Sequence, residues 1–276
     1  MSDEANFNAP AGGQAEETTG KFVITFREHA TNAGLSSLKK KTSVKKIMSA
    51  ADFKDSAMDL AQMQDTAAMV FPTLGIAVAT LDEEGANALA TEAGEESAIL
   101  AIEPERLFYA LDEELSLTYL RGYRDAISHL YDKISTEQLD EQLRAAALFH
   151  DDAQSTWGLK ATGVTTSKFT GKGIRVAVLD TGLDLRHPDF AGRSIKSKSF
   201  ISGEPVQDGH GHGTHCIGTA CGFKDVNGRR YGVAREAAIY VGKVLSNAGS
   251  GATSGILAGM EWAIVNRCSV ISMSLG

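Results

Sequence analysis

Apolar residues in the first hundred positions are gathered into short runs, separated by polar and glycine-containing segments. A helix is predicted over 34–51, and a second over 82–93, because Asp82 is placed to cap it and Ala86 and Leu89 follow at helical spacing. Runs rich in β-branched and aromatic residues predict strands at 21–26, 68–71, 76–81 and 98–102. The order β-α-β-β-α-β is that of a small ferredoxin-like α+β domain.

The pattern changes in the second half of the chain, where apolar strands alternate with helices. Helices are predicted to begin near His212 and to span 254–266, between strands at 174–179, 239–244 and 270–273. Strands that are apolar throughout and interleaved with helices form parallel sheets with both faces covered. We therefore predict an α/β fold here. Apolar residues that recur every three or four positions over 119–148 indicate a helical link between the halves.

Charge is distributed unevenly along the chain, which has 276 residues and a formal net charge of -8. Residues 1–112 carry 9 Lys and Arg against 18 Asp and Glu, whereas the remaining residues carry 18 against 17. This asymmetry indicates two units with different surfaces, and an acidic chain is a poor partner for nucleic acid. We predict a disordered tail, a ferredoxin-like domain, a helical linker and an α/β domain, at residues 1–19, 20–112, 113–156 and 157–276.

The sequence contains no recognisable targeting signal. The first residues include acidic side chains and lack a basic stretch followed by an apolar run, so we expect no secretory signal peptide. No segment is long and apolar enough to span a bilayer, so we expect no membrane partner. Cys216, Cys221 and Cys268 form no disulfide framework pattern, which favours a reducing compartment. These observations predict a cytoplasmic location.

Asp180 is the first residue with candidate chemistry. It follows the apolar run 177–179 and precedes a Thr-Gly turn. Functional groups gather at the carboxyl ends of strands in α/β sheets, which favours a role in a site. A single Asp after a strand is, however, more often a turn former or a helix cap, so Asp180 alone does not establish a functional site.

Three histidines within six positions, His210, His212 and His215, are interleaved with glycines. Glycine lets the backbone turn sharply and approach closely, so a helix that begins here would hold an imidazole rigidly. Two chemistries fit the cluster. With Asp208, the histidines could supply several ligands to zinc or iron. Alternatively, one His takes a proton from a hydroxyl group while a buried Asp fixes its tautomer, and only this interpretation gives Asp180 a role.

Several motifs, in this order along the chain, resemble those of the subtilases, the family of subtilisin-like serine proteases. The motifs are Val178-Leu179-Asp180-Thr181-Gly182 with His187-Pro188-Asp189-Phe190, and His212-Gly213-Thr214-His215. Lys243-Val244-Leu245, Gly249-Ser250-Gly251 and Ile271-Ser272-Met273-Ser274-Leu275-Gly276 are similar to segments that line the family's substrate groove. The resemblance implies a subtilisin-like parallel sheet and a serine endopeptidase that acts on proteins or peptides.

The resemblance also implies roles for single residues. Asp180 would orient the base, and His212 would be the general base and later the general acid. His215 would be structural, and His210 would lie in a solvated loop. An extended substrate would pair through its main chain with Gly249, Ser250, Gly251, Ser274, Leu275 and Gly276. Cys216 is expected to be a small buried hydrophobic residue.

No cofactor is required for this chemistry, but the resemblance suggests a site for a structural calcium ion. Its ligands would be Asp189, together with Asp225 and Asn227 from the loop that follows the His helix. The same loop contains Lys224, Arg229 and Arg230. A salt-bridged loop without calcium is therefore the alternative.

Residues from about 21 to 110 resemble the inhibitor I9 propeptide of the subtilases, a ferredoxin-like domain that assists folding and blocks the groove. The resemblance depends on the order of the elements, on residues 75–90 and on the position before the protease domain. It implies that the chain's own propeptide domain is a partner in cis.

The family's catalytic serine lies in a Gly-Thr-Ser motif, and its oxyanion-hole Asn follows a later strand. Neither motif occurs here, and the serines after His212 lack that context, at positions 246, 250, 254, 269, 272 and 274. We therefore expect an N-terminal fragment with an incomplete sheet, inactive as given. The alternatives are a pseudoprotease, a protease inhibitor or folding assistant that acts through the first domain, and a metal-dependent hydrolase built on the His cluster.

Overall fold

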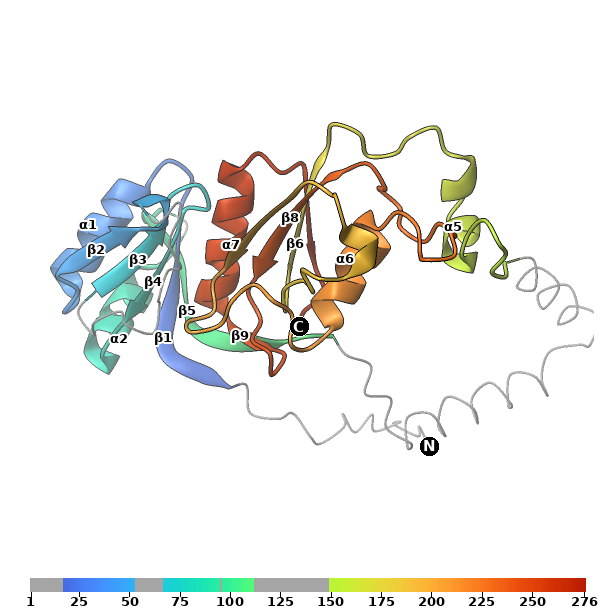
Figure 1. Cartoon of the computed structure of the whole chain (residues 1–276). Helices are drawn as coiled ribbons and strands as arrows, with labels where there is room; N and C mark the ends of the chain where they lie inside the picture. Colours follow the sequence, from blue (N-terminus) through green and yellow to red (C-terminus); the bar gives the residue numbers. More distant parts are fainter. Residues whose placement is uncertain (1–16, 53–66, 95, 112–148) are drawn as a thin grey trace, which may run out of the picture.

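The computed structural model describes residues 17–52, 67–94, 96–111 and 149–276. The tail predicted over 1–19 lies outside these ranges up to residue 16, but β1 begins at Thr18, so its last residues are ordered in a strand. The linker predicted over 113–156 lies outside them up to residue 148, and residues 149–156 contain no helix. Figure 1 shows two sheets joined by a long strand, with a helix between the sheets and other helices on their outer sides. Within the described ranges, no helix has the length and apolar character needed to cross a membrane.

The first sheet has six strands in the order β2-β3-β4-β1-β5-β9. Its N-terminal elements are β1 (Thr18–Phe26), α1 (Thr31–Lys41), β2 (Lys46–Ser49), β3 (Ala67–Phe71), β4 (Ile76–Thr80), α2 (Glu83–Glu92) and β5 (Ile99–Tyr109). Without β2, the order of elements along the chain is the predicted β-α-β-β-α-β, and the spatial order β3-β4-β1-β5 is that of the split βαβ arrangement. The predicted cap of α2 is confirmed, because Asp82 Oδ1 accepts a hydrogen bond from the Gly85 N–H at 2.8 Å.

The helix predicted over 34–51 is wrong in its second half. Helix α1 ends at Lys41 because Thr42 adopts an extended backbone, and its hydroxyl donates to the Leu38 carbonyl at 2.7 Å. The following residues form β2 and a short 3-10 turn (Ala50–Asp52) instead, and β2 pairs in parallel with β3. Tertiary pairing therefore overrides local helical propensity in this segment.

The second sheet is parallel throughout, in the order β10-β6-β8-β7, as the alternation of strands and helices predicts. The elements of the second half of the chain are α5 (Trp157–Ala161), β6 (Arg175–Asp180), β7 (Ile195–Ser199), α6 (His212–Cys221), β8 (Ala238–Lys243), β9 (Ser250–Ala252), α7 (Thr253–Val265) and β10 (Val270–Met273), with 3-10 turns at Val164–Thr166 and Pro188–Phe190. The short strand β9 leaves this unit and pairs with β5 of the first sheet.

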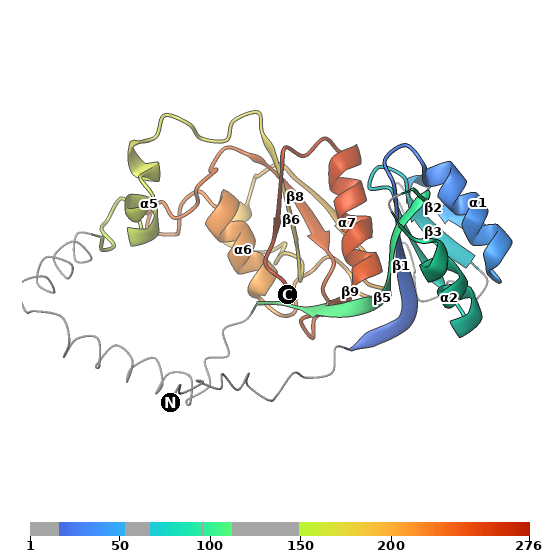
Figure 2. The same cartoon turned by 180° about the vertical axis from the view of Figure 1, so that it is seen from behind.

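Alternate residues of β6 are buried on opposite faces of the parallel sheet. Val176 and Val178 pack in one apolar cluster with Ile217 of α6, whereas Ala177 and Leu179 pack in another with residues of α7. Figures 1 and 2 show α6 and α7 on the two sides of β6 and β8. Burial on both faces explains why this strand is apolar throughout, and it brings Asp180 to the end of a rigid element.

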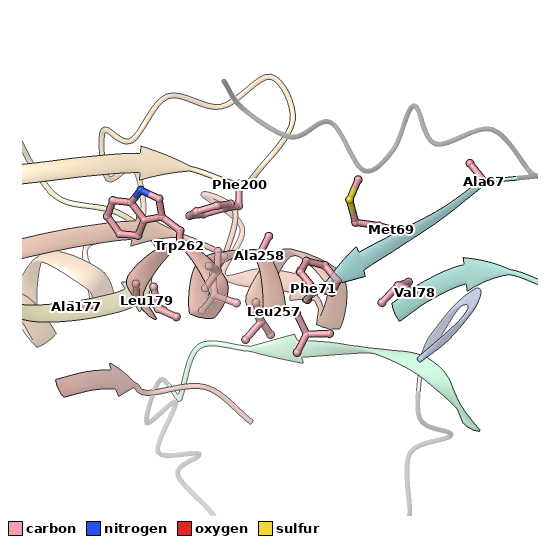
Figure 3. Close-up of a cluster of buried hydrophobic side chains, with 14 residues drawn as sticks. Ala67, Met69, Phe71, Val78, Ala177, Leu179, Phe200, Leu257, Ala258 and Trp262 are labelled. Atoms are coloured by element: carbon pink, nitrogen blue, oxygen red, sulfur yellow. The ribbon is translucent and has the colours of Figure 1, made fainter. Parts of the chain in front are cut away.

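The cluster on the α7 side is shared by the two sheets. Met69 and Phe71 of β3 lie in it together with Leu257 and Ala258 of α7. Figure 3 shows these side chains facing one another between β3 and the helix. The face of the first sheet is therefore packed against the second unit over apolar surface.

Removing the Phe71 ring should destabilise the whole chain, because this side chain is fully buried in the shared cluster. We expect Phe71→Ala to lower the free energy of unfolding by about 3–5 kcal/mol. The control Phe169→Ala, at a side chain that is 76% exposed, should change it by less than about 0.5 kcal/mol. Urea unfolding measures both, and equal effects would contradict the shared core.

Candidate active site

Asp180 is the last residue of β6, at the carboxyl end of the parallel sheet, and it is 1% exposed. One carboxylate oxygen, Oδ1, accepts a hydrogen bond from the Thr181 backbone N–H at 2.7 Å. The same oxygen lies 2.7 Å from Nδ1 of His212. The sheet and the Thr181 N–H group thus hold the Asp180 carboxylate in one orientation toward the imidazole.

His212 is the first residue of α6, and its side chain is 9% exposed. The preceding Gly211 has φ 106°, a left-handed conformation that glycine adopts without strain and that turns the chain into the helix. A carboxylate facing Nδ1 favours the tautomer in which Nδ1–H donates to it, which leaves Nε2 as a proton acceptor. The pair can therefore take a proton from a hydroxyl group placed beside Nε2.

Close backbone packing seats the start of α6 against the turn that follows β6. A Cβ atom added to Gly213 would lie 2.4 Å from the Gly182 carbonyl oxygen. The Gly213 N–H donates to the Thr181 hydroxyl at 2.8 Å, and this hydroxyl donates to Asp208 at 3.0 Å. Thr181 was missed by the sequence analysis as a site residue, although it directly follows Asp180.

Asp208 organises the loop before His212. Its carboxylate accepts hydrogen bonds from the backbone N–H groups of His210, Gly211 and Thr214 and from the Thr214 hydroxyl, at 2.6 to 3.0 Å. Burial alone would raise the pKa of Asp208, but the donors of Gly211, Thr214 and His210 together lower it to about 2. These hydrogen bonds make the Asp208 carboxylate part of the structure of the loop.

The alternative of a metal site on the three histidines and Asp208 does not fit the positions of these side chains. Among the described residues, the group whose ligand atoms converge is Asp180, His212 and Cys216, not the three histidines with Asp208. The rings of His210 and His212 lie with centroids 6.3 Å apart and nearly perpendicular, and His215 is exposed. The geometry thus favours the Asp-His pair over the metal interpretation.

Cys216 is one turn along α6 from His212, and its sulfur lies 3.8 and 3.9 Å from the two ring nitrogens. It is half-buried, so it is less buried than the small hydrophobic residue that the sequence predicts. Spacing of four positions on a helix places the thiol beside the imidazole.

The predicted groove segments lie on either side of a strand that belongs to the chain itself. Residues 107–109 pair antiparallel with β9, and the Ala110 N–H donates to the Gly249 carbonyl at 2.7 Å. On the other side, Tyr109 and Gly276 exchange two main-chain hydrogen bonds of 3.0 Å. The Leu111 N–H donates to the Ser274 carbonyl at 3.1 Å. Of the six predicted groove residues, Leu275 takes part through an antiparallel bridge to Ala110, and Ser250 and Gly251 through the ladder with β5.

The loop predicted to bind calcium has internal partners for its carboxylates. Asp225 accepts from the backbone N–H groups of Asn227 and Arg229 at 2.9 Å, and its second oxygen pairs with the Arg229 guanidinium at 3.2 Å. Burial raises the pKa of Tyr231, and so does the hydrogen bond that its hydroxyl donates to Asp189. These contacts match the salt-bridged alternative, and the calcium ion stays a prediction.

Comparison with known proteins agrees with the motifs. Residues 171–276 match the model of the subtilase family. The chain is 41% identical over 141 residues to the cuticle-degrading protease of Metarhizium anisopliae, covering 46% of this chain and 34% of that protein. It is 44% identical over 133 residues to subtilisin E of Bacillus subtilis (strain 168), with the same two shares, 46% and 34%. It is 36% identical over 184 residues to the alkaline serine protease ver112 of Corniculantispora psalliotae, covering 56% and 46%. The chain thus spans between a third and a half of the length of these relatives.

A methyl group at position 213 should displace α6 from the turn after β6. We expect Gly213→Ala to destabilise the fold by about 1–3 kcal/mol, because the backbone carbonyl of Gly182 cannot yield as a flexible side chain would. The matched control is Gly158→Ala in helix α5, where a Cβ would meet nothing within 4 Å. Thermal unfolding followed by circular dichroism compares the two, and an undisturbed Gly213→Ala variant would contradict the close packing.

Acid should weaken the loop around Asp208. Since the folded-state pKa of about 2 lies below the usual value of about 4, the stabilisation is present above the usual pKa and is lost as the pH falls toward 2. Asp208→Asn should therefore lose less stability than the wild type between about pH 5 and 2 in urea unfolding. Parallel pH curves for the two proteins would show that Asp208 does not titrate in this way.

Proposed function

We propose that the complete protein is a serine endopeptidase with Asp180 and His212 in its catalytic triad. The match of residues 171–276 to the subtilase family model and the similarity to known proteases support this proposal. The observation that carries the proposal is the hydrogen bond of 2.7 Å between the buried Asp180 carboxylate and Nδ1 of His212. The substrates would be proteins or peptides.

In the proposed reaction, Nε2 of His212 takes the proton of a seryl hydroxyl as that oxygen attacks the scissile carbonyl. Asp180 keeps the ring oriented and stabilises the imidazolium that forms. His212 then returns the proton to the leaving amine. The nucleophile and the oxyanion-hole donors would be supplied by residues outside the 276 of this sequence, and the chain by itself is expected to be inactive.

Residues 107–111 support the choice of an extended polypeptide as substrate. They lie between Ser250–Ala252 and 274–276 with main-chain hydrogen bonds on both sides, as a substrate strand would. Pairing through the main chain fits many sequences, whereas the flanking side chains set preference. The chain's own strand would thus exclude other polypeptides from the groove while it stays there.

Residues 17–111 are proposed to be an inhibitory propeptide similar to the I9 type. They have an apolar core of their own, which includes Ile24, Leu38, Val70 and Leu89. They also make polar contacts with α7: the Thr73 N–H and hydroxyl donate to the buried Glu261 carboxylate. A unit with its own core and a polar and apolar interface can fold, block the groove and later separate.

Glu105 makes the most deeply buried of these contacts. Its carboxylate is fully buried, accepts from the Thr19 hydroxyl at 2.5 Å, and accepts from the Ser254 N–H at 2.7 Å in the first turn of α7. Negative charge at the N-terminus of a helix is favourable because the first N–H groups there lack partners within the helix. This interaction joins the acidic N-terminal unit to the second unit.

Other parts of the account stay predictions. No disulfide joins the three cysteines. The cytoplasmic location stays a prediction from the sequence pattern. The absence of nucleic-acid and membrane partners, the lack of a cofactor and the pseudoprotease alternative likewise await direct tests.

Loss of the pair should abolish proteolysis in the complete protein. Asp180→Asn should lower kcat by about 10⁴-fold, because the amide no longer favours the productive tautomer, and His212→Ala should lower it at least as much. Cleavage of a chromogenic peptide measures both. Retained proteolysis in folded His212→Ala protein would refute the proposed function.

Glu105 offers a test of the propeptide. Residues 17–111, added in trans to the processed protease, should inhibit it, and Glu105→Gln should raise the inhibition constant at least about tenfold through loss of the charge at the α7 terminus. Glu103→Gln, on the same strand but exposed, is the matched control. No inhibition at micromolar concentration, or equal inhibition by both variants, would count against the assignment.

A further inference from the structure

Lys243 is a lysine with no exposed surface, at the end of β8 and opposite Asp180 in the register with β6. Burying an ammonium group is costly unless each of its donors finds an acceptor. None of the proposed catalytic steps uses this side chain. Its burial beside the Asp-His pair therefore calls for an explanation of its own.

The three donors of the Lys243 ammonium reach three different segments. Nζ donates to the Thr181 carbonyl at 2.5 Å and to Asn247 Oδ1 at 2.8 Å. It also pairs with Glu204 Oε2 at 3.3 Å, and the same oxygen accepts from the Asn247 N–H at 2.8 Å. An ammonium group has three N–H donors, so the number of donors equals the number of acceptors around Lys243.

Two of these acceptors, Thr181 and Asn247, connect Lys243 to the segments that carry Asp180 and His212. Thr181 is held by Lys243 through its carbonyl, while its own N–H binds Asp180 Oδ1 at 2.7 Å. Asn247 Oδ1, besides accepting from Lys243, accepts from the Gly209 N–H at 2.9 Å, in the loop that leads into α6. The carboxylate side and the imidazole side are therefore both tied to one buried cation.

We infer that Lys243 is a positioning residue that locks the turn after Asp180 and the loop before His212 together and so fixes the hydrogen bond between them. The inference rests on the proposed function and deepens it. Lys243 acts through Thr181 and Asn247, and it is not placed to touch the substrate.

In the complete protein, Lys243→Met keeps the length and apolar stem of the side chain but removes the three donors. We expect kcat to fall by about 10²-fold, the size of the loss when reacting groups are misplaced by about 1 Å. KM should change little, because the main-chain partners of the groove stay in place. A change in KM alone, or no change in either constant, would contradict the inference.

The histidine ring nitrogens can be observed directly in the 276-residue chain, whether or not it is active. In ¹⁵N-histidine-labelled protein, two-bond proton–nitrogen spectra report the tautomer of each ring, and His212→Ala assigns the signal. Wild-type His212 should be the Nδ1–H tautomer alone. Lys243→Met should show a mixture of tautomers, and a folded variant with the wild-type pattern would overturn the inference.

The matched control is Lys196→Met in β7, whose ammonium also donates to an asparagine Oδ1, that of Asn266 at 2.7 Å, but at an exposed position. It should leave the His212 signals unchanged. If Lys243→Met does not fold, Asn247→Ala removes the loop contact at an exposed side chain, and a wild-type tautomer there would overturn the inference. A wild-type ring that is not the Nδ1–H tautomer would contradict the Asp-His pairing of the proposed function itself.

Discussion

The hydrogen bond between Asp180 and His212 joins two elements that are 32 positions apart in the chain, the end of a central strand and the start of a helix. For it to form at 2.7 Å, the backbone after β6 and the first turn of α6 must nearly touch. That requirement accounts for Gly213, where a Cβ atom would meet the Gly182 backbone. Gly182 itself is packed against the loop before α6, where a Cβ atom would lie 2.2 Å from the Val206 carbonyl oxygen. It also accounts for the dense set of donors around Asp208, which fixes the loop between them.

The first sheet contributes more than a separate fold. Its apolar face shares a core with α7, and its last strand continues between the two groove segments. Apolar contacts from Phe71 supply non-directional attraction, whereas Glu105 at the start of α7 and the main-chain ladder of residues 107–111 fix the orientation. The strand paired on both sides and the packed core are therefore two parts of one interface, and separating the two units requires both to open.

Much of the second unit could be predicted because its signals are local. The runs that became β6, β8 and β10 are apolar along their length, and the Asp and His motifs lie beside glycines whose backbone roles can be recognised in the sequence. Strand β7, with Ile195-Lys196-Ser197-Lys198-Ser199, was missed because it is at the sheet edge and carries polar residues. Strand β2 was taken for helix because its pairing with β3 depends on residues 21 positions away.

Long-range polar contacts were the least predictable part of the site. Lys243 follows a run predicted to be a strand and lies in a motif compared with the substrate groove. Nothing local shows that its buried ammonium has Thr181, Asn247 and Glu204 as partners. The occupation of the groove by residues 107–111 likewise could not be derived from the sequence pattern, because β5 extends seven residues beyond the strand predicted to end at 102.

The central claim, that Asp180 and His212 activate a serine, is tested most directly by labelling the complete protein with a fluorophosphonate, which reacts with hydroxyls that a neighbouring base activates. The account predicts labelling of a single serine in the wild type and its loss in folded His212→Ala protein. Labelling that is equally fast without His212, or no labelling of a folded and processed wild-type protein, would contradict it.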